Sequence, residues 1–311
     1  MANELSFAAL ETNIGLAHYL AGMLRALLYD PTDLRVLMDR VPFVAGAGSE
    51  SAKVGQYSRN FAFAAASTEI SGGASNSAIG DSSFQLIVAR RLLKFTISDL
   101  WRLVAPTGSL DLDLLAGIFV EATGLTLTDM LCALFPSLTA NTAVGSTSAD
   151  MSVEYMDDAM FALNLARVPA PYAMVLRPKA YNEWFASLAT LGGGRQFKQD
   201  VQGLLSAGGP GAKGTIGNIS VYDADSVGTD GGVSYYRSAM FGRGCFAYQI
   251  APAVEMQKVL PPNVFRIDGG DVLIVHDYDA ANAITAVYAN FYPAVSEAED
   301  ARGVEIRSQV A

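Results

Sequence analysis

The sequence predicts an α+β fold, and three features carry this prediction. Apolar residues recur at helical spacing between Ser109 and Pro136. They alternate with polar or small residues in two limbs between 53 and 94. Short strand patterns separated by glycine, aspartate and proline then follow from 171 to 252. The chain therefore combines at least one long helix with several strands.

Composition limits the classes of protein to which the chain can belong. Its 311 residues suffice for one large or two medium domains, and 51% are hydrophobic while only 17% are charged. This composition fits a chain whose surface is covered by neighbours as well as by its own fold, and it fits an apolar soluble enzyme equally well. The sequence has no run of about 18 apolar residues to span a bilayer. Its start lacks the basic region of a signal peptide.

The first 52 residues are predicted to form a helical arm and a connector. Apolar residues from Ile14 to Leu28 fall near one helical face, and a second short helix is predicted in PTDLRVLMDR, opened by Pro31 or Thr32. The following VPFVAGAGSES is rich in Gly, Ala and Ser, which indicates a flexible connection.

Residues 53–94 are predicted to form a long two-stranded excursion. Phe61 and Phe63 alternate with smaller residues on the outgoing limb, Phe84 and Arg90 belong to the alternating return limb, and the tip is rich in Gly, Ser and Asn. A hairpin this long is only marginally stable alone in water. It therefore needs a surface to lie on, either a neighbouring molecule or its own domain.

Residues 95–149 contain the long helical pattern. If it is mostly unbroken, about 25 residues give a rod of roughly 35–40 Å. Gly117 and Gly124 each weaken the helix by roughly 1 kcal/mol relative to Ala, so a kink or break near Gly124 is an alternative. A loop of Ser, Thr, Ala and Asn at 137–149 marks the predicted domain boundary.

Residues 150–256 are predicted to begin with a helix capped by Ser152. PYAMVLRPKAYNEWFASL then indicates a strand and an amphipathic helix that starts at Pro178. GTIGNISVYDADSV and YYRSAMFGRGCFAYQIAP add strands, and VLIVHDY, AITAVYANFY and GVEIRS add more after residue 257. Many packing residues and few reactive groups in this part favour a structural role.

This order of parts resembles the major capsid proteins of tailed bacteriophages that have the fold named after phage Hong Kong 97. The resemblance rests on VLRPKAYNEW, a Gly-rich connection, G-x-I-G-x-I-S-V and the aromatic MFGRGCFAY strand, and it extends over nearly the whole chain. It implies five parts: an N-terminal arm at 1–52, an extended loop at 53–94, a peripheral domain with a spine helix at 95–149, an axial domain at 150–256, and return strands to the peripheral domain at 257–311.

The resemblance also implies how copies contact each other. The extended loop is expected to lie on the next subunit through Phe61, Phe63, Ile70, Gly72, Gly73, Ile79, Phe84, Arg90 and Arg91. Arg90 and Arg91 either meet an acidic neighbour or remain solvated. Some members of the family join subunits by a lysine–asparagine isopeptide bond whose lysine lies in the extended loop. Because no lysine occurs between Lys53 and Lys94, we expect no such cross-link.

The resemblance implies a structural subunit, not an enzyme, that forms the pentamers and hexamers of an icosahedral or prolate capsid around double-stranded DNA. The net charge of −10 does not suit a protein that binds nucleic acid through its phosphates. It does suit a capsid wall that weakly repels the enclosed DNA. Expected partners are other copies, a separate scaffold protein, a portal and decoration proteins, with no membrane and no sequence-specific DNA binding. We expect assembly in the host bacterial cytoplasm and a final place in the virion. An encapsulin-type compartment shell is an alternative with the same fold.

Few residues suggest catalysis or ligand binding. His18 and His276 are the only histidines. A further alternative is an acidic hydrolase that uses His276 beside Asp277 as a base. The sequence has no GxSxG motif to supply its nucleophile. LSAGGPGAKGTIG departs from the Walker order because Ala212 precedes Lys213. Five aspartates in glycine-rich turns suit turn chemistry better than calcium: Asp223, Asp225, Asp230, Asp268 and Asp271. We expect no catalytic, cofactor or metal site.

The two cysteines indicate packing rather than chemistry. Cys132 and Cys245 stand in apolar or aromatic company without metal or redox spacing. We interpret both as reduced residues of a protein that folds in the cytosol.

Overall fold

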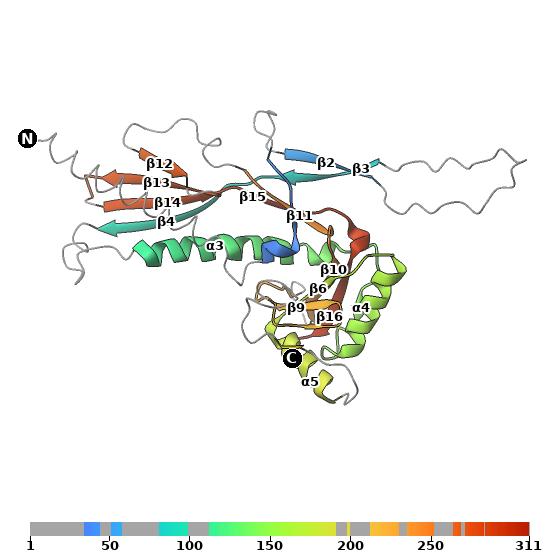
Figure 1. Cartoon of the computed structure of the whole chain (residues 1–311). Coiled ribbons are helices and arrows are strands. Elements are labelled where there is room, and N and C mark those ends of the chain that lie inside the picture. The colour runs from blue at the N-terminus through green and yellow to red at the C-terminus, as the bar shows by residue number, and fades with distance from the viewer. Residues whose placement is uncertain are drawn as a thin grey trace, which may run out of the picture.

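A computed structural model describes residues 34–43, 51–57, 81–98, 112–190, 198–199, 212–229, 235–251, 264–268, 271–282 and 284–310. Figure 1 shows two parts: a flat one, in which helix α3 runs beneath a sheet, and a second one, in which helices α4 and α5 flank a larger sheet. The helix predicted between Ile14 and Leu28 lies outside the described residues. The mixed helix and strand content confirms the predicted α+β class.

The flat part is built on a four-stranded antiparallel sheet with the order β12-β13-β14-β4. Its strands are β4 (Arg91–Ser98), β12 (Val264–Asp268), β13 (Val272–Asp279) and β14 (Ile284–Phe291). Strand β4 comes from the first third of the chain and pairs with β14 from the last third. The sheet therefore joins segments that the sequence keeps far apart.

Helix α3 (Leu112–Cys132) packs on one face of this sheet. The Phe95 and Phe119 ring centroids lie 5.5 Å apart across the contact. The helix is continuous through Gly117 and Gly124, so the alternative of a break near Gly124 is wrong. Gly124 is buried, and the surrounding packing offsets the intrinsic cost of glycine, roughly 1 kcal/mol. A short 3₁₀ turn, η2 (Phe135–Ser137), follows the helix.

The second part is built on a seven-stranded mixed sheet with the order β5-β16-β10-β6-β9-β8-β7. Its strands are β5 (Val144–Gly145), β6 (Tyr172–Leu176), β7 (Lys198–Gln199), β8 (Gly214–Ile216), β9 (Ile219–Asp223), β10 (Tyr235–Gly242) and β16 (Gly303–Gln309). One face packs on α4 (Val153–Leu165) and α5 (Pro178–Thr190) through a core around the fully buried Trp184. The predicted strand before Pro178 and the helix starting there are confirmed.

Strand β10 connects this second core to the first. Its Tyr236 and Met240 belong to the core beneath α4 and α5, whereas Ala239 and Phe241 belong to the core that contains α3. Phe241 contacts Phe246 edge-on at 4.9 Å between ring centroids. The alternation of side chains along one strand thus places apolar residues in both layers.

The last strand departs from the expected topology. We expected all strands of 257–311 to return to the peripheral part, but β16 pairs antiparallel with β10 in the seven-stranded sheet, from Tyr235 opposite Gln309 to Phe241 opposite Gly303. The physical reason is its apolar face, because Val304 and Ile306 are fully buried in the core beneath α4 and α5. Strands β12, β13 and β14 do join β4 in the four-stranded sheet.

A three-stranded sheet, β1-β11-β15, lies between the two parts. Its strands are β1 (Asp39–Arg40), β11 (Phe246–Ile250) and β15 (Pro293–Glu297). The short helix predicted in 31–40 is a 3₁₀ turn, η1 (Leu34–Leu37), where described, and the backbone N–H of Leu34 donates to Thr128 Oγ1 of α3 at 3.4 Å. This segment is therefore anchored on its own chain.

The start of α4 differs in detail from the prediction. Ser152 occupies the cap position, but its side chain makes no capping hydrogen bond. Instead the backbone N–H of Val153 donates to Ser187 Oγ of α5 at 3.1 Å, and that of Met151 donates to Glu183 Oε2 at 3.2 Å. The N–H group of the first helical residue is thus satisfied by the neighbouring helix, and the two hydrogen bonds also fix the two helices to each other.

Candidate assembly surfaces

The predicted contact residues of the extended loop fall into two groups. Phe84, Arg90 and Arg91 are described; the remaining six lie outside the described residues: Phe61, Phe63, Ile70, Gly72, Gly73 and Ile79. The described base of the predicted loop is a two-stranded antiparallel ribbon, in which β2 (Ser51–Tyr57) pairs with β3 (Asp81–Ile87). Contact of this loop with another copy stays a prediction.

The base of the ribbon is anchored on its own chain. Leu86 and Val88 are buried with Leu273 and Val275 of β13, on the face of the four-stranded sheet opposite α3, and Phe84 packs partly against the same cluster. Alternation turns Ile87 outward, and 60% of its surface is exposed. The end of the ribbon near residues 86–88 is thus packed firmly against the four-stranded sheet.

The two arginines after β3 have different surroundings. Arg90 Nε donates to Asn290 Oδ1 of β14 at 2.8 Å, so its described partner is a neutral amide rather than an acidic side chain. Arg91 is exposed at the start of β4, opposite Phe291 in the strand register. Further along β4, the Lys94 ammonium lies over the Tyr288 ring, 5.3 Å from its centroid. Arg90, Arg91 and Lys94 thus place three exposed cations at or beside the last strand of this sheet.

A second exposed surface lies on α4 and was not predicted. Phe161 and Leu165 are 63% and 70% exposed, although both are large apolar residues in a well-packed helix. Glu154 and Asp158 are exposed at positions that continue the same helical stripe toward the N-terminus. The signal was present in the sequence, because 154, 158, 161 and 165 fall on a different side of the helix from the buried Val153, Met156 and Leu163.

A cleft of about 550 Å³ runs along one flank of the same helix. Met156 and Met160 line it from α4, and Ile216 and Ile219 line it from the β8–β9 hairpin. At its edge the Tyr172 hydroxyl donates to Asn164 Oδ1 at 2.9 Å. Its lining is mainly apolar and offers no nucleophile with a paired base.

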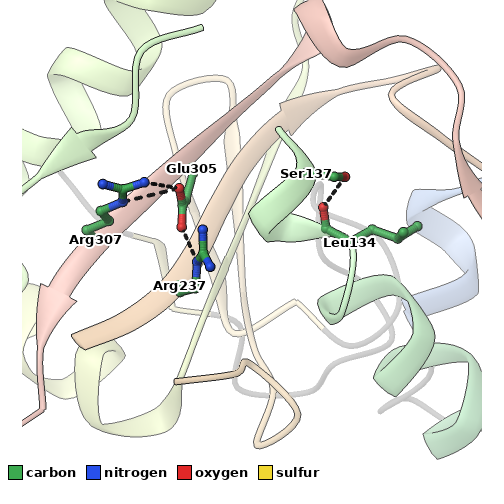
Figure 2. A network of polar contacts seen from close by, with 5 residues as sticks. All are labelled: Leu134, Ser137, Arg237, Glu305 and Arg307. Carbon is green, nitrogen blue, oxygen red and sulfur yellow. Dashed lines mark hydrogen bonds and ion pairs between the residues drawn. The ribbon is translucent and has the colours of Figure 1, made fainter. Parts of the chain in front are cut away.

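Polar contacts tie the end of α3 to the chain around η3 (Asp300–Arg302). The Asp300 carboxylate accepts from the backbone N–H groups of Thr139 and Ala140, each at 2.8 Å. Ser137 Oγ lies within hydrogen-bond distance of both Leu134 O, drawn in Figure 2, and Glu297 Oε2. Burial raises the pKa of Glu297. The hydrogen bond from Ser137 lowers this pKa, and the nearby Asp300 charge raises it, so the net direction is upward.

A buried carboxylate holds β16 to β10. Glu305 is only 2% exposed and lies between two guanidinium groups, those of Arg237 and Arg307 (Figure 2). Its Oε2 accepts from Arg307 Nη2 at 2.8 Å, and its Oε1 from Arg237 Nε. The two guanidinium groups compensate the charge that the sheet buries.

Where the structure describes them, the residues considered for chemistry do not converge. His276 is a mid-strand residue of β13, opposite Phe265 and Val287 in the register. Asp223 pairs with Lys213 at 3.3 Å, and Asp271 pairs with Arg40 at 3.3 Å. Among the described residues no three His, Cys, Asp or Glu side chains gather as a metal site would require. Within the same ranges, no helix has the length and apolarity needed to cross a membrane.

Both cysteines are buried free thiols, as predicted from their surroundings. Burial, together with the Asp129 charge, raises the pKa of Cys132 to about 12. Burial likewise raises the pKa of Cys245 well above its usual value. Thiolate chemistry is therefore suppressed at both positions.

Comparison with known proteins identifies the fold. No protein-family model matches the sequence, and no curated protein matches it. Among solved structures, the chain is similar to the holo-SrpI encapsulin complex from Synechococcus elongatus (TM-score 0.60, 10% identity, 90% of this chain and 88% of that chain covered). It is also similar to the capsid of Ralstonia phage GP4 (TM-score 0.59, 12% identity, 88% and 87% covered) and to the capsid of an empty GTA particle (TM-score 0.55, 11% identity, 91% and 92% covered). The chain has the α+β fold shared by Hong Kong 97-type phage capsid proteins and encapsulins, as the sequence predicted.

Proposed function

We propose that this chain is a shell-forming structural protein, and specifically the major capsid subunit of a tailed phage. One observation carries the proposal: the fold matches proteins of phage capsids and an encapsulin over nearly the full length of both chains. Exposed apolar side chains at both β3–β4 and α4 support it, because such residues in a shell subunit become buried against neighbouring copies. The proposed action is assembly into pentamers and hexamers around double-stranded DNA, without catalysis.

In this proposal the parts of the chain have the roles expected from the resemblance. Residues 1–52 act as an arm and 53–94 as the extended loop on the neighbouring subunit. The part with α3 forms the wall, and the part with α4 and α5 surrounds the symmetry axes. The last strand, β16, is assigned to the axial part because of its pairing with β10. A scaffold protein, a portal and decoration proteins are the proposed partners in the bacterial cytoplasm, and the virion is the final location.

The direct test is to produce the chain in a bacterium, alone and with its neighbouring genes, and to examine the product by sedimentation and electron microscopy. Closed particles of uniform size are the expected result, and a compact monomer at every concentration contradicts the proposal. Deletion of residues 72–80 should leave the subunit folded while impairing assembly. An SDS gel of the particles should show no covalent ladder, because no lysine occurs between Lys53 and Lys94.

A compartment shell is the second candidate, favoured by the similarity to the encapsulin complex. The two kinds of particle differ in what they enclose. Particles filled by DNA, with terminase and portal genes nearby, support the capsid, whereas particles that co-purify with one enzyme support the compartment. Isolation of native particles followed by nuclease digestion and mass spectrometry separates these outcomes.

A further inference from the structure

Two exposed surfaces of the chain are complementary in charge. The first, here called the α4 stripe, comprises Glu154, Asp158, Phe161 and Leu165. The second, here called the β4 edge, comprises Arg90, Leu92 and Lys94. Alternation places Leu92 and Lys94 on one face of the strand, and Arg90, just before the strand, bonds Asn290 opposite Leu92. The α4 stripe is acidic and apolar, and the β4 edge is basic and apolar, in a protein whose net charge is −10.

In the described part of the chain, the α4 stripe presents unpaired carboxylates and exposed apolar surface. Among the residues that the structure describes, neither Glu154 nor Asp158 has an ion-pair partner. Phe161 and Leu165 retain 63% and 70% of their surface. The buried side of the helix packs on β10 and β16, so this exposure is not the result of poor packing. The stripe therefore presents two anionic and two apolar side chains in one row.

The β4 edge offers the matching groups on a rigid support. Leu92 is 50% exposed between Arg90 and Lys94. Asn290 holds the Arg90 guanidinium, and the Tyr288 ring lies beneath the Lys94 ammonium, so both cations have fixed positions. From Arg90 to Lys94 the strand covers roughly 13 Å. The α4 stripe from Glu154 to Leu165 covers roughly 16 Å. The two rows are similar in length.

The two surfaces belong to different parts of one chain. Figure 1 shows α4 at the outer side of the seven-stranded sheet and β4 in the flat part, with the body of the protein between them. Contact between them therefore requires a second copy. Such a contact joins two different surfaces, so it is head-to-tail. Repeated head-to-tail contacts close into a ring when the rotation that relates one copy to the next divides a full turn evenly.

We propose that the α4 stripe of one subunit binds the β4 edge of the next copy. The proposal rests on the proposed function as a shell subunit and adds to it the surfaces that meet. Lys94 approaches the carboxylates of Glu154 and Asp158, and Leu92 covers Phe161 or Leu165. The occupant of each surface is another copy of this chain.

The test is charge reversal with rescue in the full chain. Lys94→Glu and Asp158→Lys should each lower the yield of assembled particles about tenfold or more, because like charges then meet. The double variant should recover to within about threefold of the unaltered chain. Asp225→Lys, in an exposed turn outside both surfaces, is the matched control and should assemble normally. Circular dichroism of each variant verifies its folding.

A second measurement detects the contact by cross-linking. Leu92→Cys combined with Leu165→Cys should form intersubunit disulfides under mild oxidation and give a ladder of multimers on a non-reducing gel. Each single variant should stop at dimers. Background from Cys132 and Cys245 is low because both thiols are buried.

The outcomes separate the two proposals. Particles that form normally with Lys94→Glu and Asp158→Lys, or loss of assembly that the double variant does not recover, would overturn the pairing of these surfaces. Failure of the unaltered chain to assemble under any condition would overturn the shell function itself.

Discussion

Strands β10 and β4 are both eight residues long but have opposite surroundings. β10 lies between β16 and β6, and six of its eight residues are buried, because helices cover one face and the aromatic core covers the other. β4 is the last strand of its sheet, α3 covers only one of its faces, and Leu92 is half exposed. The part around β10 is therefore stabilised by its own chain, whereas the part around β4 leaves one strand face exposed.

The largest effect should come from the centre of the self-stabilised part. Trp184→Ala removes the largest fully buried side chain beside β10 and β6, and we expect a loss of about 3–5 kcal/mol in the free energy of unfolding. Phe185→Ala, on the exposed side of the same helix, should cost less than about 1 kcal/mol. Urea unfolding followed by circular dichroism measures both. Equal losses would mean that this core does not support the part with α4 and α5.

A matched pair of substitutions tests the two strands directly. Met240→Ala on β10 leaves a cavity at a fully buried position and should cost about 2–4 kcal/mol. Leu92→Ala on β4 should cost less than about 1 kcal/mol in the isolated subunit. If Leu92→Ala unfolds the subunit, β4 depends on its own chain as much as β10 does and the contrast fails.

The attachment of β16 to β10 should respond to loss of its carboxylate. Glu305→Ala leaves Arg237 and Arg307 without their anion, and we expect a loss of about 2–3 kcal/mol, moderated because both guanidinium groups retain some contact with water. Glu154→Ala, which removes an exposed carboxylate, should change stability by less than about 0.5 kcal/mol. Thermal unfolding midpoints of the two variants provide the comparison.

The smallest effect concerns pH at the junction of the two parts. Burial raises the pKa of Glu297 above 4.5, so the folded state binds the proton more tightly than the unfolded state does. The ionised carboxylate then lowers stability at neutral pH, and this penalty disappears as the pH falls through the raised pKa toward 4.5. Glu297→Gln should therefore be more stable than the unaltered chain at pH 7, by less than about 1 kcal/mol. The two stabilities should converge by pH 4, and divergence there would show that the hydrogen bond with Ser137 dominates.

Local signals in the sequence predicted much of the fold but less of the candidate surfaces. Pro178 placed the start of α5 correctly, because proline suits the first turn of a helix. The partner of β16 was missed, since an apolar strand can pair with any sheet that offers a free edge. Ser152 was expected to cap α4 with its side chain, but Ser187 of a different helix supplies the hydrogen bond, which sequence spacing does not reveal.

The α4 stripe was missed for a related reason. A helical period identifies the buried side of a helix from residues such as Met156 and Leu163, and the remaining positions are then assigned to solvent. Phe161 and Leu165 are exposed as that assignment requires, but large apolar side chains are unusual at exposed helix positions. Apolar residues outside the predicted core stripe are the signal to seek in similar chains.

The pairing of β16 with β10 also affects how quickly the chain folds. Neighbouring strands in the seven-stranded sheet come from distant places in the chain, and such non-local pairing slows folding because long loops must close before any contact forms. Until β16 arrives, β10 has a free edge and Met240 lacks part of its cover. In the shell that we propose, the rate of this folding step sets the rate at which subunits become available, and a slow supply favours the growth of few nuclei over the simultaneous start of many.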